Sequence, residues 1–150
     1  MPSLSDSNIP LPDAELEVLR KQFHREGENV TLTTKFNLAW GLIKSRRSND
    51  QREGMELMRD IYDNDPQRRR ECIYYLAVGH YKLGEYSEAR HFVDALLRDE
   101  PRNPQATELK KAIDDRVSRD GIIGLAIVGG LIAVVGGAIA ALRNRDRSRS

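Results

Sequence analysis

The chain has 150 residues, of which 39% are hydrophobic and 31% are charged, and its formal net charge at pH 7 is +1. Four of its 24 Lys and Arg and one of its 23 Asp and Glu lie beyond residue 120, so residues 1–120 carry a net charge of −2. This balance argues against a nucleic-acid-binding protein, which usually has a basic face, and the single cysteine, Cys72, excludes an internal disulfide and a cysteine-based metal cluster.

Residues 1–12, MPSLSDSNIPLP, contain three prolines and are predicted to form an extended arm without a helix. Leu4, Ile9 and Leu11 are isolated apolar side chains in this arm. They suit an arm that lies across an apolar surface of the following domain, whose predicted bounds are residues 13–120. A disordered terminus is the alternative that the same composition allows.

The first predicted helix begins at Asp13. Leu16, Leu19 and Phe23 follow at i, i+3 and i+7, which is the spacing of one apolar helix face. Acidic residues in its first turns suit the helix dipole. Gly27 is expected to end it.

Residues 36–66 and 74–101 repeat each other, with the shared pattern Leu-Ala-x-Gly at an offset of 38. The second copy resembles a tetratricopeptide repeat, a helix-turn-helix unit of roughly 34 residues. The matching positions are Leu76, Ala77, Gly84, Tyr86, Ala89 and Pro101. The second copy departs from the repeat pattern at His80, where Tyr is usual, and the first copy has Gly54 in place of Ala.

Two such repeats need capping helices, because each buries its apolar face only against a neighbour. The helix from Asp13 is one candidate cap. The other is predicted to begin at Asn103-Pro104, a favourable N-cap and first-turn pair. Its apolar positions are Ala106, Leu109, Ile113 and Val117.

The first helix of each repeat carries a second apolar strip at i, i+4 and i+7, and a helix with two apolar faces needs cover on both. The strip consists of Phe36, Trp40 and Ile43 in the first copy and Tyr74, Val78 and Tyr81 in the second. In the repeat family this strip lines a concave groove that binds peptides. The alternative is that these residues form the ordinary core of a small helical domain.

No catalytic pattern is visible. His24, His80 and His91 are scattered, without carboxylates or cysteine at ligand or triad spacing, and His80 is expected to fill a position between helices. A glycine-rich phosphate-binding loop is also missing from the sequence. We therefore expect no enzymatic activity, no metal and no cofactor.

Residues 121–142 contain no charged or polar side chain, and as a helix they would be about 33 Å long, enough to cross a bilayer core of roughly 30 Å. We expect a transmembrane tail anchor, inserted after translation, with residues 1–120 in the cytosol. A short basic tail, residues 143–150, follows it. The basic residues of that tail, assigned to membrane targeting, are Arg143, Arg145, Arg147 and Arg149.

Six Gly and five Ala make this span only moderately hydrophobic. Moderate hydrophobicity with a basic tip resembles the tail signal of outer mitochondrial membrane proteins, with peroxisomes as a second address. The small residues Gly129, Ala133, Gly137 and Ala141 lie on one helix face, where a second anchor could approach and form a homo-oligomer. Alternatively, they only lower the hydrophobicity for targeting.

The order of these parts resembles the mitochondrial fission 1 protein family, in its fungal branch. The most specific stretches are FNLAWGLIKS at residues 36–45 and YLAVG at residues 75–79. The resemblance implies an all-α, six-helix bundle with two tetratricopeptide-like helix pairs, capping helices and one C-terminal transmembrane helix.

The same resemblance implies an adaptor in the outer mitochondrial and peroxisomal membranes. It would recruit a dynamin-related GTPase through WD-repeat adaptor proteins that dock a helical segment in the groove, and the N-terminal arm would take part. A tail-anchored tetratricopeptide receptor for chaperones or other peptides is the alternative. Its carboxylate clamp needs Lys and Asn where this chain has Phe36 and Trp40.

Overall fold

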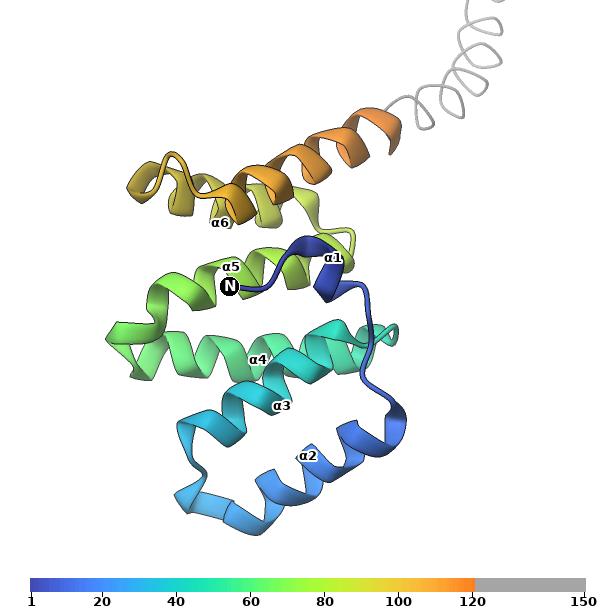
Figure 1. Ribbon diagram of the computed structural model, residues 1–150, viewed down its shortest axis with the longest axis vertical. Coiled ribbons are helices and arrows are strands. Elements are labelled where there is room, and N and C mark those ends of the chain that lie inside the picture. Colours follow the sequence, from blue (N-terminus) through green and yellow to red (C-terminus); the bar gives the residue numbers. More distant parts are fainter. Residues whose placement is uncertain (121–150) are drawn as a thin grey trace, which may run out of the picture. The chain divides into compact units, whose positions relative to one another are not determined.

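The computed structural model describes residues 1–120, and every regular element in that part of the chain is helical (Figure 1). In chain order the helices are α1 (Leu4–Ser7), α2 (Asp13–Glu26), α3 (Leu32–Lys44), α4 (Ser48–Asn64), α5 (Arg69–Lys82), α6 (Tyr86–Asp99) and a last helix over residues 104–120. Short 3-10 turns, Gly27–Asn29 and Pro66–Arg68, precede α3 and α5. The predicted all-helical class is confirmed for the described residues, but they contain seven α-helices where six were expected, because α1 forms within the arm.

Residues Met1–Ile113 form one compact unit, and a second unit begins at Asp114 within the last helix. Among the helices of residues 1–120, none combines the length and apolar character needed to cross a membrane. The predicted span over residues 121–142 lies outside the described residues.

Helices α3 and α4 form one pair and α5 and α6 a second, which confirms the two predicted repeats. Helix α4 also packs on α5, and α2 packs on α3, so successive helices lie in layers (Figure 1). Burial of each large apolar side chain stabilises such a stack by about 1.5–3 kcal/mol. The largest fully buried side chains include Leu38, Leu42, Ile43, Met58, Ile61, Tyr74, Leu76, Leu96, Leu109 and Ile113.

Gly54 stands where the second repeat has Ala89, and the close approach of α3 and α4 explains the difference. A Cβ atom at Gly54 would lie 2.6 Å from the carbonyl oxygen of Ala39 and 2.9 Å from the amide nitrogen of Ile43. Both of these atoms belong to the backbone of α3 and have no freedom to move aside. The first helix pair therefore requires glycine at this position.

The ends of two helices follow from their capping residues. Asn103 begins the last helix, as predicted, because its side-chain oxygen accepts a hydrogen bond of 3.0 Å from the N–H of Ala106. Gly84 ends α5 with a φ of 77°, a backbone conformation that glycine adopts without strain. The N–H of Glu85 then donates to the carbonyl of His80 at 2.9 Å, which completes a Schellman motif.

The prediction that residues 1–12 contain no helix is wrong. Ser3 caps the single turn of α1: its hydroxyl accepts a hydrogen bond from the N–H of Asp6, whose carboxylate accepts one of 2.9 Å from the N–H of Ser3. This reciprocal capping box supplies partners for the first N–H groups of the turn. The prolines, at positions 2, 10 and 12, all lie outside the turn and so do not prevent it.

Candidate functional site

The six residues of the predicted groove differ in depth. Ile43, Tyr74 and Val78 are completely buried, with 0% of their surface exposed. Phe36, Trp40 and Tyr81 are half-buried and pack against the same core. Only these last three side chains are accessible to a partner while the chain keeps this conformation.

Aromatic ring contacts bring three of the six residues together. Tyr75 lies at the centre: its ring centroid is 5.1 Å from that of Phe36, 4.8 Å from that of Trp40 and 5.6 Å from that of Tyr74. These four residues are called the aromatic cluster below, and they join α3 to α5. Tyr81 makes its ring contact elsewhere, with Tyr86 of α6 at 6.0 Å.

Sequence reasoning assigned no role to Tyr75. Helix α5 has eight buried residues, which occupy all of its faces, so hydrophobic periodicity does not distinguish one of them. The residue type of Tyr75 could have identified it. A second tyrosine directly after Tyr74 places another large aromatic ring in the same helical turn. Only the packing of α3 against α5 shows that this ring joins Phe36 to Trp40.

Two cations lie over the outer rings of the aromatic cluster. The ammonium of Lys44 is 5.9 Å from the Trp40 ring centroid, and the guanidinium carbon of Arg68 is 5.6 Å from that of Phe36. Both distances are within the range of cation–π attraction. The accessible part of the cluster therefore has a cation at each border, and the one at Arg68 is paired with the carboxylate of Glu71 at 3.4 Å.

The N-terminal arm lies against this region of the fold. Leu4 is only 8% exposed and belongs to the same core cluster as Tyr74 and Val78. Leu11 approaches α3, since its Cδ1 lies 2.9 Å from the position that a Cβ of Gly41 would occupy. Ile9, by contrast, is 64% exposed.

Two hydrogen bonds join the arm to distant elements. Lys82, at the end of α5, donates to the carbonyl oxygen of Ser7 at 2.7 Å, and the side-chain amide of Gln105 donates to the carbonyl oxygen of Met1 at 3.4 Å. Figure 1 shows α1 in front of α5, in agreement with the first of these contacts. Burial, followed by the charges of Lys44 and Arg46, lowers the pKa of Lys82.

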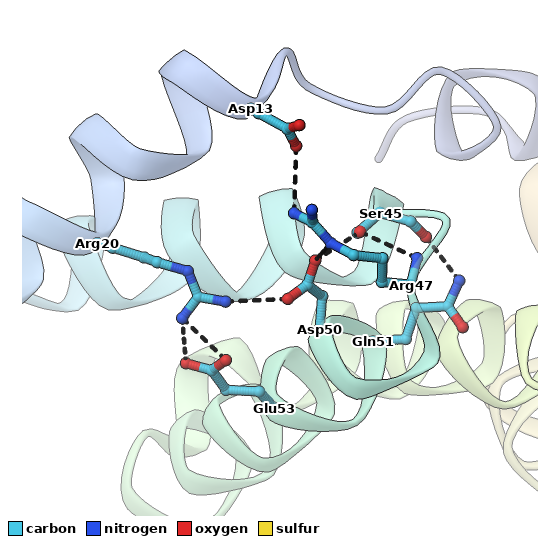
Figure 2. A network of polar contacts seen from close by, with 7 residues as sticks. All are labelled: Asp13, Arg20, Ser45, Arg47, Asp50, Gln51 and Glu53. Carbon is cyan, nitrogen blue, oxygen red and sulfur yellow. Dashed lines mark hydrogen bonds and ion pairs between the residues drawn. The ribbon is translucent and has the colours of Figure 1, made fainter.

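A polar network holds α2 against the connection between α3 and α4 (Figure 2). Asp50 lies at its centre and is 8% exposed. Its carboxylate accepts hydrogen bonds from Arg20 at 3.0 Å, from Arg47 at 2.7 Å and from the hydroxyl of Ser45 at 2.7 Å. Glu53, also bound to Arg20 at 2.7 Å, completes the inner part.

The outer members of the network extend it in two directions. Arg47 reaches Asp13 at the start of α2, at 3.1 Å, and Gln51 donates to the backbone carbonyl of Ser45 at 2.6 Å. Burial alone would raise the pKa of the Asp50 carboxyl, but the hydrogen bonds from Arg47 and Ser45 and the charges of Arg47 and Arg20 outweigh it and lower that pKa. The network is thus a structural connection in which the ionised side chains of Asp50, Arg20 and Arg47 are the main members.

His80 and Cys72 are both buried in the core of the domain. His80 is 7% exposed, its ring stacks on Phe92 of α6 at 5.4 Å, and its Nδ1 lies 2.7 Å from the carboxylate of Glu85. It therefore fills a position between helices, as predicted. Burial raises the pKa of the completely buried Cys72 thiol to about 12, and within residues 1–120 no three His, Cys, Asp or Glu side chains are grouped to hold a metal ion.

The predicted targeting and helix-pairing residues of the tail lie outside the described residues. They are Arg143, Arg145, Arg147, Arg149, Gly129, Ala133, Gly137 and Ala141.

Two protein-family profiles match the chain. The Fis1 N-terminal tetratricopeptide repeat matches residues 33–65, and the Fis1 C-terminal tetratricopeptide repeat matches residues 70–122. The mitochondrial fission 1 protein of Yarrowia lipolytica is 48% identical over 147 residues, which are 98% of this chain and 96% of the relative.

Solved structures of yeast Fis1 are similar to the chain as well. Yeast Fis1 in complex with an Mdv1 fragment containing the N-terminal extension and coiled coil domains has a TM-score of 0.77 and 45% identity, over 81% of this chain and 96% of that one. Yeast Fis1 complexed with a fragment of yeast Caf4 has a TM-score of 0.59 and 51% identity, over 62% of this chain and 96% of that one. The chain therefore belongs to the mitochondrial fission 1 protein family.

Proposed function

We propose that this chain is an adaptor of mitochondrial fission, which captures a partner protein and catalyses no reaction. The observation that carries the proposal is that three aromatic side chains of α3 and α5, Phe36, Trp40 and Tyr81, are half-buried beside a docked arm. Large aromatic side chains with one accessible side are the usual anchors of a protein interface. Similar yeast proteins have been solved with Mdv1 and Caf4 fragments, which supports an adaptor of that type as the partner here.

The partner surface has an accessible part and a covered part. Phe36, Trp40 and Tyr81 are the residues that a partner segment would touch first. Ile43, Tyr74 and Val78 become contacts only where the arm moves or shares the surface with the partner. In the arm itself, exposed Ile9 offers a contact to the partner, whereas Leu4 and Leu11 hold the arm on the domain.

The action is physical and needs no bond to form or break. Anchoring in a membrane would confine the domain to one surface, where several copies bind WD-repeat adaptors that in turn bind a dynamin-related GTPase. Multivalent capture of this kind raises the local concentration of the GTPase without any new contact. The fission machinery would then assemble where the anchor is located.

The anchor is proposed to be residues 121–142, in the outer mitochondrial membrane and also in the peroxisomal membrane, with the helical domain in the cytosol. The length and apolar composition of this segment support the assignment. The four arginines beyond it would direct the anchor to its membrane. The stripe of small residues would let two anchors pair as a homo-oligomer.

Binding to the full chain in lipid nanodiscs tests the partner surface. The probe is the Mdv1-type adaptor fragment from the same cells, and the variant is Trp40→Ala. We expect affinity to fall by more than about tenfold, as for a central aromatic anchor. Val18→Ala is the matched control, because Val18 is 62% exposed and lies on α2. Undiminished binding by a folded Trp40→Ala chain would contradict the assignment of this surface.

Mitochondrial shape tests the role in the cell. Cells without the protein should have fused, net-like mitochondria, and the full chain should restore separate ones. A chain that ends at residue 120 should fail to do so, although it contains the whole partner surface. Unchanged mitochondria in cells without the protein would contradict the fission role, and binding of an acidic C-terminal chaperone peptide would then favour a chaperone receptor.

A further inference from the structure

Tyr74 places a polar atom in an apolar environment without a hydrogen bond. Its side chain is 0% exposed, and among residues 1–120 no donor or acceptor pairs with its hydroxyl. Buried hydroxyls nearly always have a partner, because burial removes their hydrogen bonds to water. The ring itself is well placed, with its edge against Tyr75 at 5.6 Å. Packing thus explains the phenyl ring of Tyr74 but not its hydroxyl.

Tyr74 of α5 belongs to a core cluster to which the arm contributes Leu4 and the last helix contributes Leu109. Gln105 of the last helix holds the arm through the carbonyl of Met1. Burial, followed by the charge of Glu108 in the last helix, raises the pKa of the Tyr74 phenol, and Asp6 of α1 acts in the same direction. The arm lies in front of α5 in Figure 1 and is held there by Lys82 and Gln105, so it is placed to cover this part of the core.

An unpaired hydroxyl beneath the arm raises the free energy of the docked state. The arm is therefore held less firmly than its apolar contacts alone would hold it. Any state in which the hydroxyl finds a partner regains what burial removed. A partner segment that offers the hydroxyl a hydrogen-bond acceptor can consequently displace the arm from this position. This argument rests on the proposed function, since it needs a partner segment at the same surface.

The chemistry around the hydroxyl limits what that segment can present. The phenol keeps its proton at neutral pH, so it serves as a hydrogen-bond donor. The negative charges of Glu108 and Asp6 help to raise the pKa of the phenol, and charges of this sign would repel a third carboxylate. A neutral acceptor, such as the side-chain carbonyl of Asn or Gln, matches these surroundings.

We propose that the Tyr74 hydroxyl determines the specificity of this surface: it is unpaired beneath the docked arm and donates a hydrogen bond to a neutral amide carbonyl of the bound partner segment. The apolar contacts of the aromatic cluster attract many segments of similar shape. The hydroxyl selects among them the one with an amide at the matching position, since an apolar group there would leave it unpaired.

Tyr74→Phe tests both halves of the proposal, because it removes only the hydroxyl. In the full chain in nanodiscs, hydrogen–deuterium exchange of residues 1–12 should become slower, since the arm now covers an apolar ring. Affinity for the Mdv1-type adaptor fragment should fall by about three- to tenfold, the effect of one hydrogen bond. Faster arm exchange or unchanged affinity in this variant overturns the proposal.

Tyr75→Phe is the matched control. It removes a neighbouring phenol from the same cluster, but the Tyr75 hydroxyl is not among the buried side-chain atoms without a partner in the described part of the chain. Arm exchange in this variant should equal that of the unmodified chain. Equal slowing in both variants would show that loss of any phenol has this effect, which contradicts a special role for Tyr74.

A second measurement avoids substitution. Infrared spectroscopy of the unmodified chain with isotope-labelled tyrosine reports hydrogen bonding of the phenol through its C–O stretching band, and adding the adaptor fragment should shift the band of one of the five tyrosines. No shift overturns the proposal. If Trp40→Ala weakens binding and Tyr74→Phe does not, the specificity proposal fails alone, whereas undiminished binding by both variants contradicts the proposed surface itself.

Discussion

The ammonium of Lys82 and the backbone carbonyl of Ser7 form a hydrogen bond of 2.7 Å across 75 residues of sequence. It joins the last turn of α5 to the last residue of α1. A charged donor on a neutral acceptor forms one of the stronger hydrogen bonds in proteins. Since α5 belongs to the second repeat, this bond makes the position of the arm dependent on the folded repeat.

Replacement of Lys82 by methionine should loosen the arm without unfolding the domain. The apolar stem of the side chain is kept, and only the hydrogen bond to Ser7 is lost. We expect hydrogen–deuterium exchange of residues 1–12 to become about three- to tenfold faster, the equivalent of one hydrogen bond. Thermal unfolding should change little, and a large drop in melting temperature would contradict a local role for Lys82.

Gly54→Ala should destabilise the fold. The added Cβ would lie 2.6 Å from the carbonyl oxygen of Ala39, so α3 and α4 must separate. Overpacking costs typically 1–3 kcal/mol, and because the clash is with backbone atoms we expect the upper part of this range, which outweighs the gain of about 1 kcal/mol in helix propensity from Gly to Ala. Urea unfolding of the full chain in detergent measures the difference in free energy.

Gly79→Ala is the comparison that isolates the backbone clash. Its Cβ would also meet an atom at 2.7 Å, but that atom is Cγ of Met55, in a flexible side chain that can change rotamer. We expect a change in the free energy of unfolding within about 1 kcal/mol of zero. Equal destabilisation by both substitutions would show that the Ala39 backbone is not the limiting contact.

Much of the fold could be predicted because it depends on local patterns. The offset between the Leu-Ala-x-Gly sequences located both helix pairs, and Asn103 marked the start of the last helix. The helix in the arm could not be found in this way. Proline counting predicted an extended segment, whereas the capping box of Ser3 and Asp6 needs only four residues between the prolines. A specific pair of hydrogen bonds outweighed the composition.

Spacing in the sequence could propose residues for the candidate site, but it could not predict how deeply each of them is buried. Spacing placed Phe36, Trp40 and Tyr74 in the predicted apolar strips of α3 and α5, and the rings of all three contact Tyr75. Spacing could not separate the buried Tyr74 from the half-buried Trp40, because depth depends on the arm and the last helix. The role of Tyr75 was missed for the same reason, since it arises from packing between two helices that are distant in sequence.

Asp50→Asn should weaken the connection of α2 to the α3–α4 turn. The substitution keeps the shape of the side chain but removes the charge that Arg20 and Arg47 bind, at an expected cost of about 1–3 kcal/mol in the free energy of unfolding at pH 7. Asp13→Asn is the matched control. Asp13 contacts the same Arg47, but its side chain is 84% exposed, and an exposed ion pair contributes little.

Acid should reduce the difference between Asp50→Asn and the unmodified chain. The pKa of Asp50 is lower in the folded chain than its ordinary value of 3.8, so its contribution is complete above pH 3.8 and is lost as the pH falls through the folded pKa. Urea unfolding between pH 7 and the acid limit of folding measures this. A difference that stays constant below pH 3.8 would mean that the charge of Asp50 does not stabilise the fold.

Cys72 should resist thiol reagents until the domain opens. It is completely buried, and burial, followed by the charge of Glu71, raises its pKa to about 12, so almost none of it is thiolate at pH 8. We expect labelling at least about a thousandfold slower than in the chain unfolded by urea, where the thiol has its ordinary pKa. Because Cys72 is the only cysteine, the labelling rate reports opening of this part of the core without interference from another thiol.

Leu4→Ala should leave the rate unchanged if the arm detaches separately from the domain, whereas faster labelling in that variant would show that the arm and α5 open together.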